Sequence, residues 1–194
     1  ELALPELLSW RLHNDALLVM QGNCVIHESY RNGFLPSDKH VVHSTAKSLT
    51  TLLIGMAIKE GLVDPDAPIT TYLAAFSDLD AWSGITVQHV LDMRAGLAYD
   101  EHYDDPDSVC WRYFRAAGYY PPKEDTHRGY VDWVRAEMAC LSTEPGMVFN
   151  YASPLTNALG LVAEAVYGQS VAELLEEKIY RHIGAEQEAW LNLD

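Results

Sequence analysis

Two strand-like segments open this chain, and almost everything after them has a helical pattern. Residues 16–20 and 24–30 are rich in β-favouring side chains, and the Gly22-Asn23 dipeptide between them suits a tight turn. The pattern predicts a β-hairpin. Two strands alone do not form a stable sheet in water. The hairpin therefore either packs on the helices as a small flap or belongs to a larger sheet whose other strands lie outside this chain.

The strongest helical pattern covers residues 47–60. Its apolar side chains recur at the spacing of one helix face, at Leu49, Leu52, Leu53, Met56 and Ala57. Gly61 follows directly, at a position where helices favour a left-handed residue. We expect a core helix here, with Ser44 at its start.

Capping residues mark the starts of three further helices. Thr86 is expected to cap a short helix, and Ser153 to cap a longer one in which Pro154 takes the first position. Ser170 and Glu173 have the spacing of a capping box at the start of the last helix. Weaker helical patterns cover residues 107–117 and 130–140.

The charge of the chain excludes several classes of partner. Its 13 Lys and Arg residues against 28 Asp and Glu residues give a formal net charge of −15. Such a chain lacks the basic surface that a nucleic acid or an anionic membrane requires. No apolar stretch approaches the roughly 20 residues of a membrane span. We therefore expect a protein that binds neither nucleic acid nor membrane.

Three widely spaced cysteines, Cys24, Cys110 and Cys140, include no Cys-x-x-Cys pair. This pattern is typical of reduced, mostly buried thiols in a reducing compartment, so the cytoplasm is slightly favoured. The chain does not begin with Met, which leaves export open. The metal-binding pattern His-Glu-x-x-His, the phosphate loop and the Gly-x-Ser-x-Gly elbow are all missing. We expect no metal and no cofactor.

Ser44-Thr45-Ala46-Lys47 is the first candidate for chemistry. Residues three apart share one helix face, so the serine hydroxyl and the lysine amine are expected to be neighbours. A serine nucleophile needs an adjacent base, and a lysine is a base only without its proton. A helix start favours loss of that proton, and its N–H groups suit a developing oxyanion. The alternative is a plain N-cap serine followed by a solvated lysine.

Tyr151-Ala152-Ser153 is the second candidate. A tyrosine held at a loop–helix junction can relay protons when a nearby cation lowers its pKa from about 10. Lys47 would be that cation, and the two groups would share protons as a coupled pair. The alternative is a packing tyrosine, because the chain contains 11 tyrosines.

Four segments, in their order along the chain, indicate a protein family more strongly than either candidate does alone. They are Ser44-Thr45-Ala46-Lys47-Ser48, residues 85–97, Glu144-Pro145-Gly146 and Phe149-Asn150-Tyr151. With their flanks, from Val19 to Gly184, they resemble the serine β-lactamase and penicillin-binding-protein superfamily. The resemblance is to its class C-like branch, which contains the 6-aminohexanoate-dimer hydrolases (nylon-oligomer hydrolases) and related esterases.

This resemblance implies an α/β fold of the β-lactamase/DD-peptidase type. Residues 1–43 would form the N-terminal part of a split antiparallel sheet, with the hairpin, and residues 44–194 would form the helical domain. The resemblance also implies a serine hydrolase that cleaves small esters or linear amides, without metal or cofactor, through an acyl-enzyme on Ser44. Lys47 would be the general base, and Tyr151 would pass a proton to the leaving group.

Other roles also follow from the resemblance. The Ser44 backbone N–H would form one half of the oxyanion hole. The acidic loop 100–107 would flank the substrate cleft, so Tyr99 and Tyr103 would contact the substrate, as would Ser153. Taken by itself, the same loop is interpreted as a solvated or lid loop rather than as a site for a cation or an amine.

Two departures from the family pattern shape the expected function. Class C β-lactamases have Asn where this chain has Ser153, whose shorter side chain offers one donor rather than two. This difference favours the esterase or amidase branch over efficient β-lactam turnover. The family's Lys-Thr-Gly motif lies on a C-terminal strand that supplies the other oxyanion N–H, and this chain ends before it, at Asp194.

We therefore expect that the C-terminal strands of the sheet are missing from this chain and that a complementary polypeptide would complete it. Two alternatives remain beside an active hydrolase. One is a catalytically incomplete fragment that binds β-lactams or D-peptides. The other is a remnant of the fold without a function.

Overall fold

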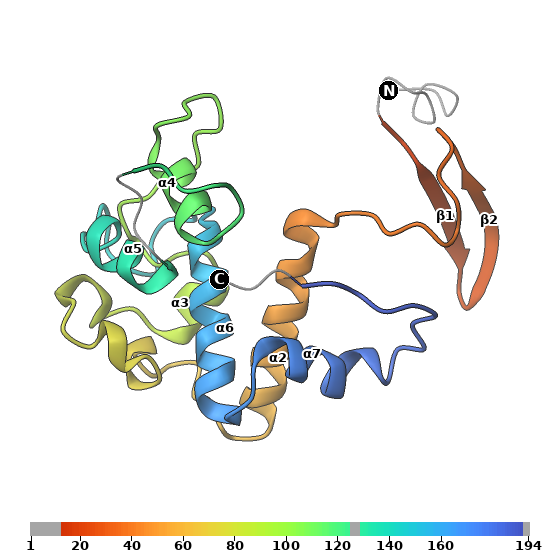
Figure 1. Ribbon diagram of the computed structural model, residues 1–194. Helices are drawn as coiled ribbons and strands as arrows, with labels where there is room; N and C mark the ends of the chain where they lie inside the picture. The colour runs from red at the N-terminus through yellow and green to blue at the C-terminus, as the bar shows by residue number, and fades with distance from the viewer. Residues whose placement is uncertain (1–12, 125–128, 192–194) are drawn as a thin grey trace. The chain divides into compact units, whose positions relative to one another are not determined.

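The computed structural model describes residues 13–124 and 129–191 (Figure 1). The chain forms two compact units, of which the first ends at Val41 and the second begins at Val42. The division expected from the sequence lies slightly later, after residue 43. The first unit carries the strands, and the second carries the helices.

The first unit contains an antiparallel β-hairpin. Strand β1, Ala16–Gln21, pairs with strand β2, Cys24–Tyr30, so that Ala16 lies opposite Tyr30. Gly22 in the turn has a φ of 58°, which glycine adopts without strain. The predicted hairpin is confirmed.

Both strands of the hairpin carry exposed apolar side chains. These are Leu18, Val19 and Met20 on β1, and Val25 and Ile26 on β2. Among the described residues, the sheet consists of these two strands. An isolated strand pair is marginally stable in water. The exposed surface is therefore typical of strands that belong to a larger sheet.

The second unit is helical. Its α-helices are α2 (Lys47–Lys59), α3 (Val87–Leu91), α4 (Val109–Ala116), α5 (Tyr130–Glu137), α6 (Ser153–Tyr167) and α7 (Val171–Leu175). A π-helix, Glu176–Tyr180, continues α7. Short 3-10 helices lie at His43–Ala46 (η2), Ile69–Thr71, Ala74–Phe76 and Asp80–Trp82. Each helix predicted from the sequence is present, with ends that differ by a few residues.

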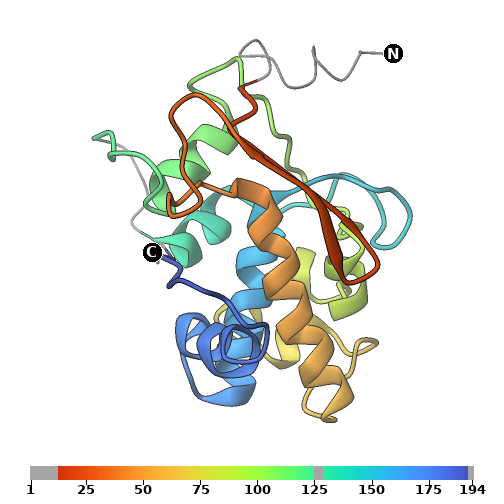
Figure 2. The same cartoon turned by 90° about the vertical axis from the view of Figure 1, so that its right-hand side faces the viewer.

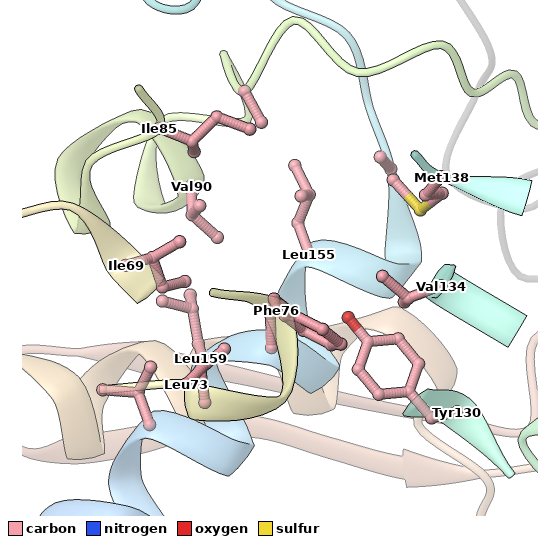
Figure 3. Close-up of a cluster of buried hydrophobic side chains, with 14 of the residues drawn as sticks. Ile69, Leu73, Phe76, Ile85, Val90, Tyr130, Val134, Met138, Leu155 and Leu159 are labelled. Carbon is pink, nitrogen blue, oxygen red and sulfur yellow. The ribbon is translucent and has the colours of Figure 1, made fainter. Parts of the chain in front are cut away.

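Helix α6 lies at the centre of the helical unit. It packs against α2, α3 and α7, and Figure 2 shows α2 lying across it. Leu155 and Leu159 of α6 join Phe76 and Val134 in one buried cluster (Figure 3). Full burial of such a side chain contributes about 1.5–3 kcal/mol. This cluster fixes the helix that follows directly after the Tyr151 segment.

Two of the predicted helix caps are confirmed. Thr86 Oγ1 accepts a hydrogen bond from the His89 backbone N–H at 3.1 Å. Ser170 Oγ accepts from the Glu173 backbone N–H at 3.3 Å, and the Glu173 carboxylate accepts from the Ser170 N–H at 2.9 Å. These caps need only neighbouring residues, which is why the local sequence predicts them.

The prediction that Ser153 caps α6 is wrong. Ala152 is the N-cap, Ser153 is the first helical residue, and no side chain makes a capping hydrogen bond. The Ser153 backbone N–H instead donates to Glu101 Oε1 at 2.6 Å. A carboxylate far away in the sequence thus replaces the local cap.

The expectation of mostly buried thiols is also wrong. Cys110 is buried, whereas Cys24 and Cys140 are exposed, and all three are unpaired thiols. Cys140 lies just beyond α5, where its carbonyl oxygen accepts a hydrogen bond from the Ala98 N–H at 2.9 Å. The backbone of Cys140 is therefore tied to that of Ala98, although the residue itself is exposed.

No single helix among the described residues has both the length and the apolar content needed to cross a membrane. Helix α6 and the segment Val171–Tyr180 meet these criteria only as a pair, across a bend of 82°.

Residues 93–97 cross closely over the loop that leads to Tyr151. The Gly96 carbonyl oxygen accepts hydrogen bonds from the Ser142 and Thr143 N–H groups at 2.8 and 3.2 Å. Gly96 has a φ of 73°, and a Cβ atom at this position would overlap the carbonyl oxygen of Thr143. The crossing therefore requires glycine, both for its conformation and for space.

We expect Gly96→Ala to destabilise the protein more than Gly61→Ala. Gly61 has a similar φ of 76°, but a Cβ there would meet nothing within 4 Å. A left-handed alanine costs roughly 1–2 kcal/mol, and overlap with packed backbone adds about 1–3 kcal/mol. Urea unfolding followed by circular dichroism should show a free energy of unfolding lowered by about 2–5 kcal/mol for Gly96→Ala and about 1–2 kcal/mol for Gly61→Ala. Equal losses would contradict the close crossing.

Candidate active site

Ser44 lies in a 3-10 turn that leads directly into helix α2. The turn is η2, and Lys47 is the first residue of α2. Lys47 Nζ donates a hydrogen bond to Ser44 Oγ at 2.8 Å. Neither η2 nor α2 begins with a side-chain cap, and Ser44 is the cap residue of neither helix. The alternative interpretation of Ser44 as a plain N-cap is therefore wrong.

The Ser44 hydroxyl is accessible. Ser44 is exposed, and Lys47 is half-buried. His43, directly before the serine, has a φ of 43°, a conformation that is uncommon for residues other than glycine. Because Ser44 lies in the first turn of η2, its N–H has no acceptor within the helix. A hydroxyl held by an amine beside such an N–H suits attack on a carbonyl carbon.

Tyr151 reaches the same place from a distant part of the sequence. Helices α2 and α6 pack against each other with their first residues at the same end of the helical unit (Figure 1). Tyr151 precedes α6 by two residues. Lys47 Nζ lies 5.4 Å from the centre of the Tyr151 ring, and the tyrosine is 37% exposed. The structure thus brings Ser44, Lys47 and Tyr151 together, as their predicted roles require.

The surroundings of Tyr151 make its phenol more acidic. Partial burial pushes the pKa of Tyr151 upward. Hydrogen bonding to Ser44, Lys47 and Ser153, together with the charge of Lys47, outweighs this effect. The pKa of Tyr151 is therefore below its usual value of 10.0. A phenol with a lowered pKa exchanges its proton more readily at neutral pH.

Glu101 is a carboxylate beside this group that the sequence-based site omits. Its Oε1 accepts hydrogen bonds from the Ser153 N–H at 2.6 Å and from the Tyr99 hydroxyl at 3.3 Å. Its Oε2 accepts from the Tyr103 hydroxyl. Burial and the Glu101 charge raise the pKa of Tyr99 far above its usual value, and the hydrogen bond to Glu101, with burial, raises the pKa of Tyr103. Both phenols are thus held as proton donors.

A methionine anchors the backbone on both sides of Tyr151. The Met93 carbonyl oxygen accepts from the Asn150 N–H at 2.8 Å, and the Met93 sulfur accepts from the Ala152 N–H at 3.4 Å. Met93 has a φ of 55°, a strained conformation for a residue with a side chain. The Asn150 side chain also donates to the Tyr99 carbonyl oxygen at 2.7 Å. Tyr151 therefore lies on a backbone held before and after it.

The residues predicted to contact substrate differ in exposure. Tyr103 is 56% exposed, Tyr99 is 6% exposed and Ser153 is 7% exposed. Tyr99 packs edge-on against Trp133, with ring centres 5.9 Å apart. Of these three residues, Tyr103 is therefore the one whose side chain is exposed to solvent. Tyr99 is connected to the site by the hydrogen bond from its hydroxyl to Glu101. Their contacts with substrate stay predictions.

One pattern in the sequence could have indicated Glu101. Tyr99, Glu101 and Tyr103 alternate, and alternate residues of an extended segment point to the same side. The neighbouring carboxylates in residues 100–107 hide this pattern, because composition alone does not show which one turns inward.

The titratable groups of this site are one amine, three phenols and one carboxylate. Within residues 13–124 and 129–191, no cluster of three or more His, Cys, Asp or Glu side chains could hold a metal ion.

We expect Lys47→Met to raise the pKa of Tyr151. The substitution removes two of the influences that lower it, the hydrogen bond and the charge of the lysine. The phenolate should then form only at higher pH, which NMR titration of ring-labelled tyrosine can follow. Lys59→Met, at the other end of the same helix, is the matched control and should leave Tyr151 unchanged. A Tyr151 pKa that stays the same in Lys47→Met would contradict the described contact.

The chain is similar to several known proteins. Residues 11–191 match the Beta-lactamase family. The 6-aminohexanoate-dimer hydrolase of Paenarthrobacter ureafaciens is 32% identical over 181 residues, which cover 93% of this chain and 45% of that protein. A Bacillus anthracis structure provisionally named as a 6-aminohexanoate-dimer hydrolase is 25% identical. It superposes with a TM-score of 0.81 over 95% of this chain and 48% of that one.

A more distant structure shares the fold. The D-stereospecific amidohydrolase from a Streptomyces species is 22% identical, with a TM-score of 0.58, and the match covers 74% of this chain and 42% of that one. The chain thus spans about half the length of the relatives that it matches. The match over most of the chain, with its helical unit and antiparallel hairpin, shows that the chain belongs to the Beta-lactamase family and has the fold of serine β-lactamases and penicillin-binding proteins.

Proposed function

We propose that this chain carries the acylating centre of a serine hydrolase that cleaves small esters or linear amides. The supporting observation is the hydrogen bond from Lys47 to Ser44, with Tyr151 beside both residues. Ser44 would be the nucleophile, Lys47 the general base and Tyr151 the proton relay. The substrate class follows the name of the Paenarthrobacter relative, because a 6-aminohexanoate dimer is a linear amide.

In the first step, the Ser44 oxygen would attack the substrate carbonyl carbon while its proton passes to the Lys47 amine. Lys47 and Tyr151 would share protons as a coupled pair, which lets the amine accept this one. The Ser44 N–H would stabilise the tetrahedral oxyanion. The C–O or C–N bond would then break, and Tyr151 would pass a proton to the leaving alcohol or amine.

In the second step, water would add to the acyl carbon and give its proton to the Lys47–Tyr151 pair. The bond to Ser44 Oγ would break, Ser44 would regain its proton, and the acyl group would leave as a carboxylic acid. Absence of one oxyanion donor lowers rates about 10²–10³-fold. A complementary polypeptide that supplies the second donor is therefore part of the proposal.

Tyr103 is the residue that we propose for substrate contact. Its hydroxyl donates to Glu101, its ring stacks on Phe114 with centres 6.3 Å apart, and its carbonyl oxygen accepts from Trp111 Nε1 at 3.0 Å. Two contacts thus hold the exposed ring, and the third holds the backbone of the same residue. A preorganised aromatic ring suits an apolar chain of a substrate. Ser153 would contribute through its hydroxyl.

The alternative is a fragment that is acylated or binds its ligand but does not turn over. The observation that favours this alternative is that the chain covers 45% of the Paenarthrobacter relative. It differs from the main proposal in the second step alone, because Ser44 would still react with an activated ester or a β-lactam.

We expect a fluorophosphonate to label Ser44 in the chain as it stands. Intact-mass measurement should show one added group, and peptide mapping should place it on Ser44. Ser44→Ala should abolish the adduct, because the nucleophile is gone. Ser48→Ala, which changes an exposed serine one turn further along α2, should react like the unmodified chain. An adduct on another residue, or equal labelling of Ser44→Ala, would refute the proposal.

A p-nitrophenyl ester separates the two functions. Release of p-nitrophenol beyond one equivalent indicates turnover, and a single burst followed by a stable acyl adduct indicates the incomplete fragment. Addition of a polypeptide that carries the remaining half of a family member should increase turnover if the second oxyanion donor is what limits it.

A further inference from the structure

The Ser153 N–H is held by a charged group from another part of the chain. As the first residue of α6, Ser153 has a backbone N–H without an acceptor inside the helix. Glu101 Oε1 accepts it at 2.6 Å, and hydrogen bonds to a carboxylate are shorter and stronger than those between neutral groups. The positive end of a 15-residue helix further favours a carboxylate at this point.

This hydrogen bond lies close to the proposed proton relay. Tyr151 is two residues before Ser153, and the Ser153 side chain is one of the groups that lower the pKa of the phenol. Met93 holds the neighbouring residues, Asn150 and Ala152, through its carbonyl and its sulfur. A sulfur acceptor is weak. Glu101 is therefore the strongest described anchor on the helix side of Tyr151.

We propose that Glu101 is a positioning residue that fixes the Tyr151–Ser153 turn through the Ser153 N–H and so holds the Tyr151 phenol beside Ser44 and Lys47. The proposal rests on the proposed hydrolase function. Glu101 itself does not touch the reacting atoms. It sets the geometry of the group that does, and a displacement of about 1 Å in such a group can cost about 100-fold in rate.

An electrostatic role for Glu101 predicts a different outcome. The groups that face Tyr151 are Ser44 from η2, Lys47 from α2, the neighbouring Ser153, and Tyr103, whose pKa responds to Tyr151. If Glu101 acted by its charge, its removal would make the Tyr151 phenolate easier to form. If Glu101 acts by position, its removal lets Tyr151 move away from Lys47 and makes the phenolate harder to form.

The test compares Glu101→Ala, Glu101→Gln and Asp104→Ala. Alanine removes the acceptor, whereas glutamine keeps a carbonyl oxygen for the Ser153 N–H and loses only the charge. Asp104 is a neighbouring exposed carboxylate and serves as the control. Two readouts are measured on each full chain: the fluorophosphonate labelling kinetics of Ser44 and the Tyr151 pKa from NMR titration of ring-labelled tyrosine.

We expect Glu101→Ala to lower the maximal labelling rate about 10–100-fold with little change in the half-saturating probe concentration. The pKa of Tyr151 should rise in the same variant. Glu101→Gln should recover most of the rate, and Asp104→Ala should match the unmodified chain. A Tyr151 pKa that falls or stays constant in Glu101→Ala, or a glutamine variant as slow as the alanine variant, would overturn the proposal.

A third measurement needs no substitution. In the unmodified chain, the Ser153 amide resonance should shift strongly as the Glu101 carboxylate is protonated, because the acceptor of its hydrogen bond changes. A Ser153 amide that does not respond would overturn the proposal even if Glu101→Ala failed to fold. If Ser44 is not labelled in any variant, the proposed function fails, while the amide and Tyr151 titrations still decide the role of Glu101.

Discussion

The position of Tyr151 depends on a short loop that is tied to one neighbouring segment. Residues 93–101 supply the acceptors for this loop: Met93 binds the N–H groups of Asn150 and Ala152, and Glu101 binds that of Ser153. Asn150 is partly buried and Ala152 and Ser153 are buried, and unpaired buried N–H groups are costly. The same bonds that satisfy the backbone therefore also fix the phenol against Ser44 and Lys47.

The three tyrosines of the site have different pKa values because different charged groups lie beside them. A carboxylate, Glu101, accepts from Tyr99 and Tyr103. Burial together with Glu101 raises the pKa of Tyr99, and Glu101 together with burial raises that of Tyr103, whereas an amine, Lys47, helps to lower the pKa of Tyr151. Groups of one chemical type whose pKa values are pushed apart take different roles in a site. Here two phenols keep their protons as structural donors, and one is suited to exchange its proton. This division supports the proposed assignment of the relay to Tyr151.

Local sequence patterns predicted the parts of this structure that depend on neighbouring residues. The hairpin turn at Gly22, the long helix after Ser44, the Thr86 cap and the Ser170 capping box are all determined within a few positions. The chemistry of a tyrosine beside a cation linked Tyr151 to Lys47, and the family resemblance gave both residues their expected roles. Neither argument identified Glu101, because its contact with Ser153 joins residues 52 positions apart in the chain. For the same reason the Ser153 cap was wrongly predicted.

The chain covers one helical unit and one hairpin of a family whose matched members are about twice as long. All three proposed catalytic residues lie within the helical unit. Acylation of Ser44 can therefore be tested separately from completion of the sheet, which the proposal requires for the second oxyanion donor. Acylation depends on contacts among the described residues of the helical unit. Completion of the sheet depends on strands that would pair with the exposed hairpin.

The most direct test of the proposed site is a crystal structure of the chain after reaction with a boronic acid, which mimics the tetrahedral intermediate. We predict a covalent bond from Ser44 Oγ to boron, with Lys47 Nζ and the Tyr151 hydroxyl both within hydrogen-bonding distance of the adduct. Boron bound to another residue, or a Tyr151 phenol turned away from Ser44, would contradict the assignment of these three residues to one active site.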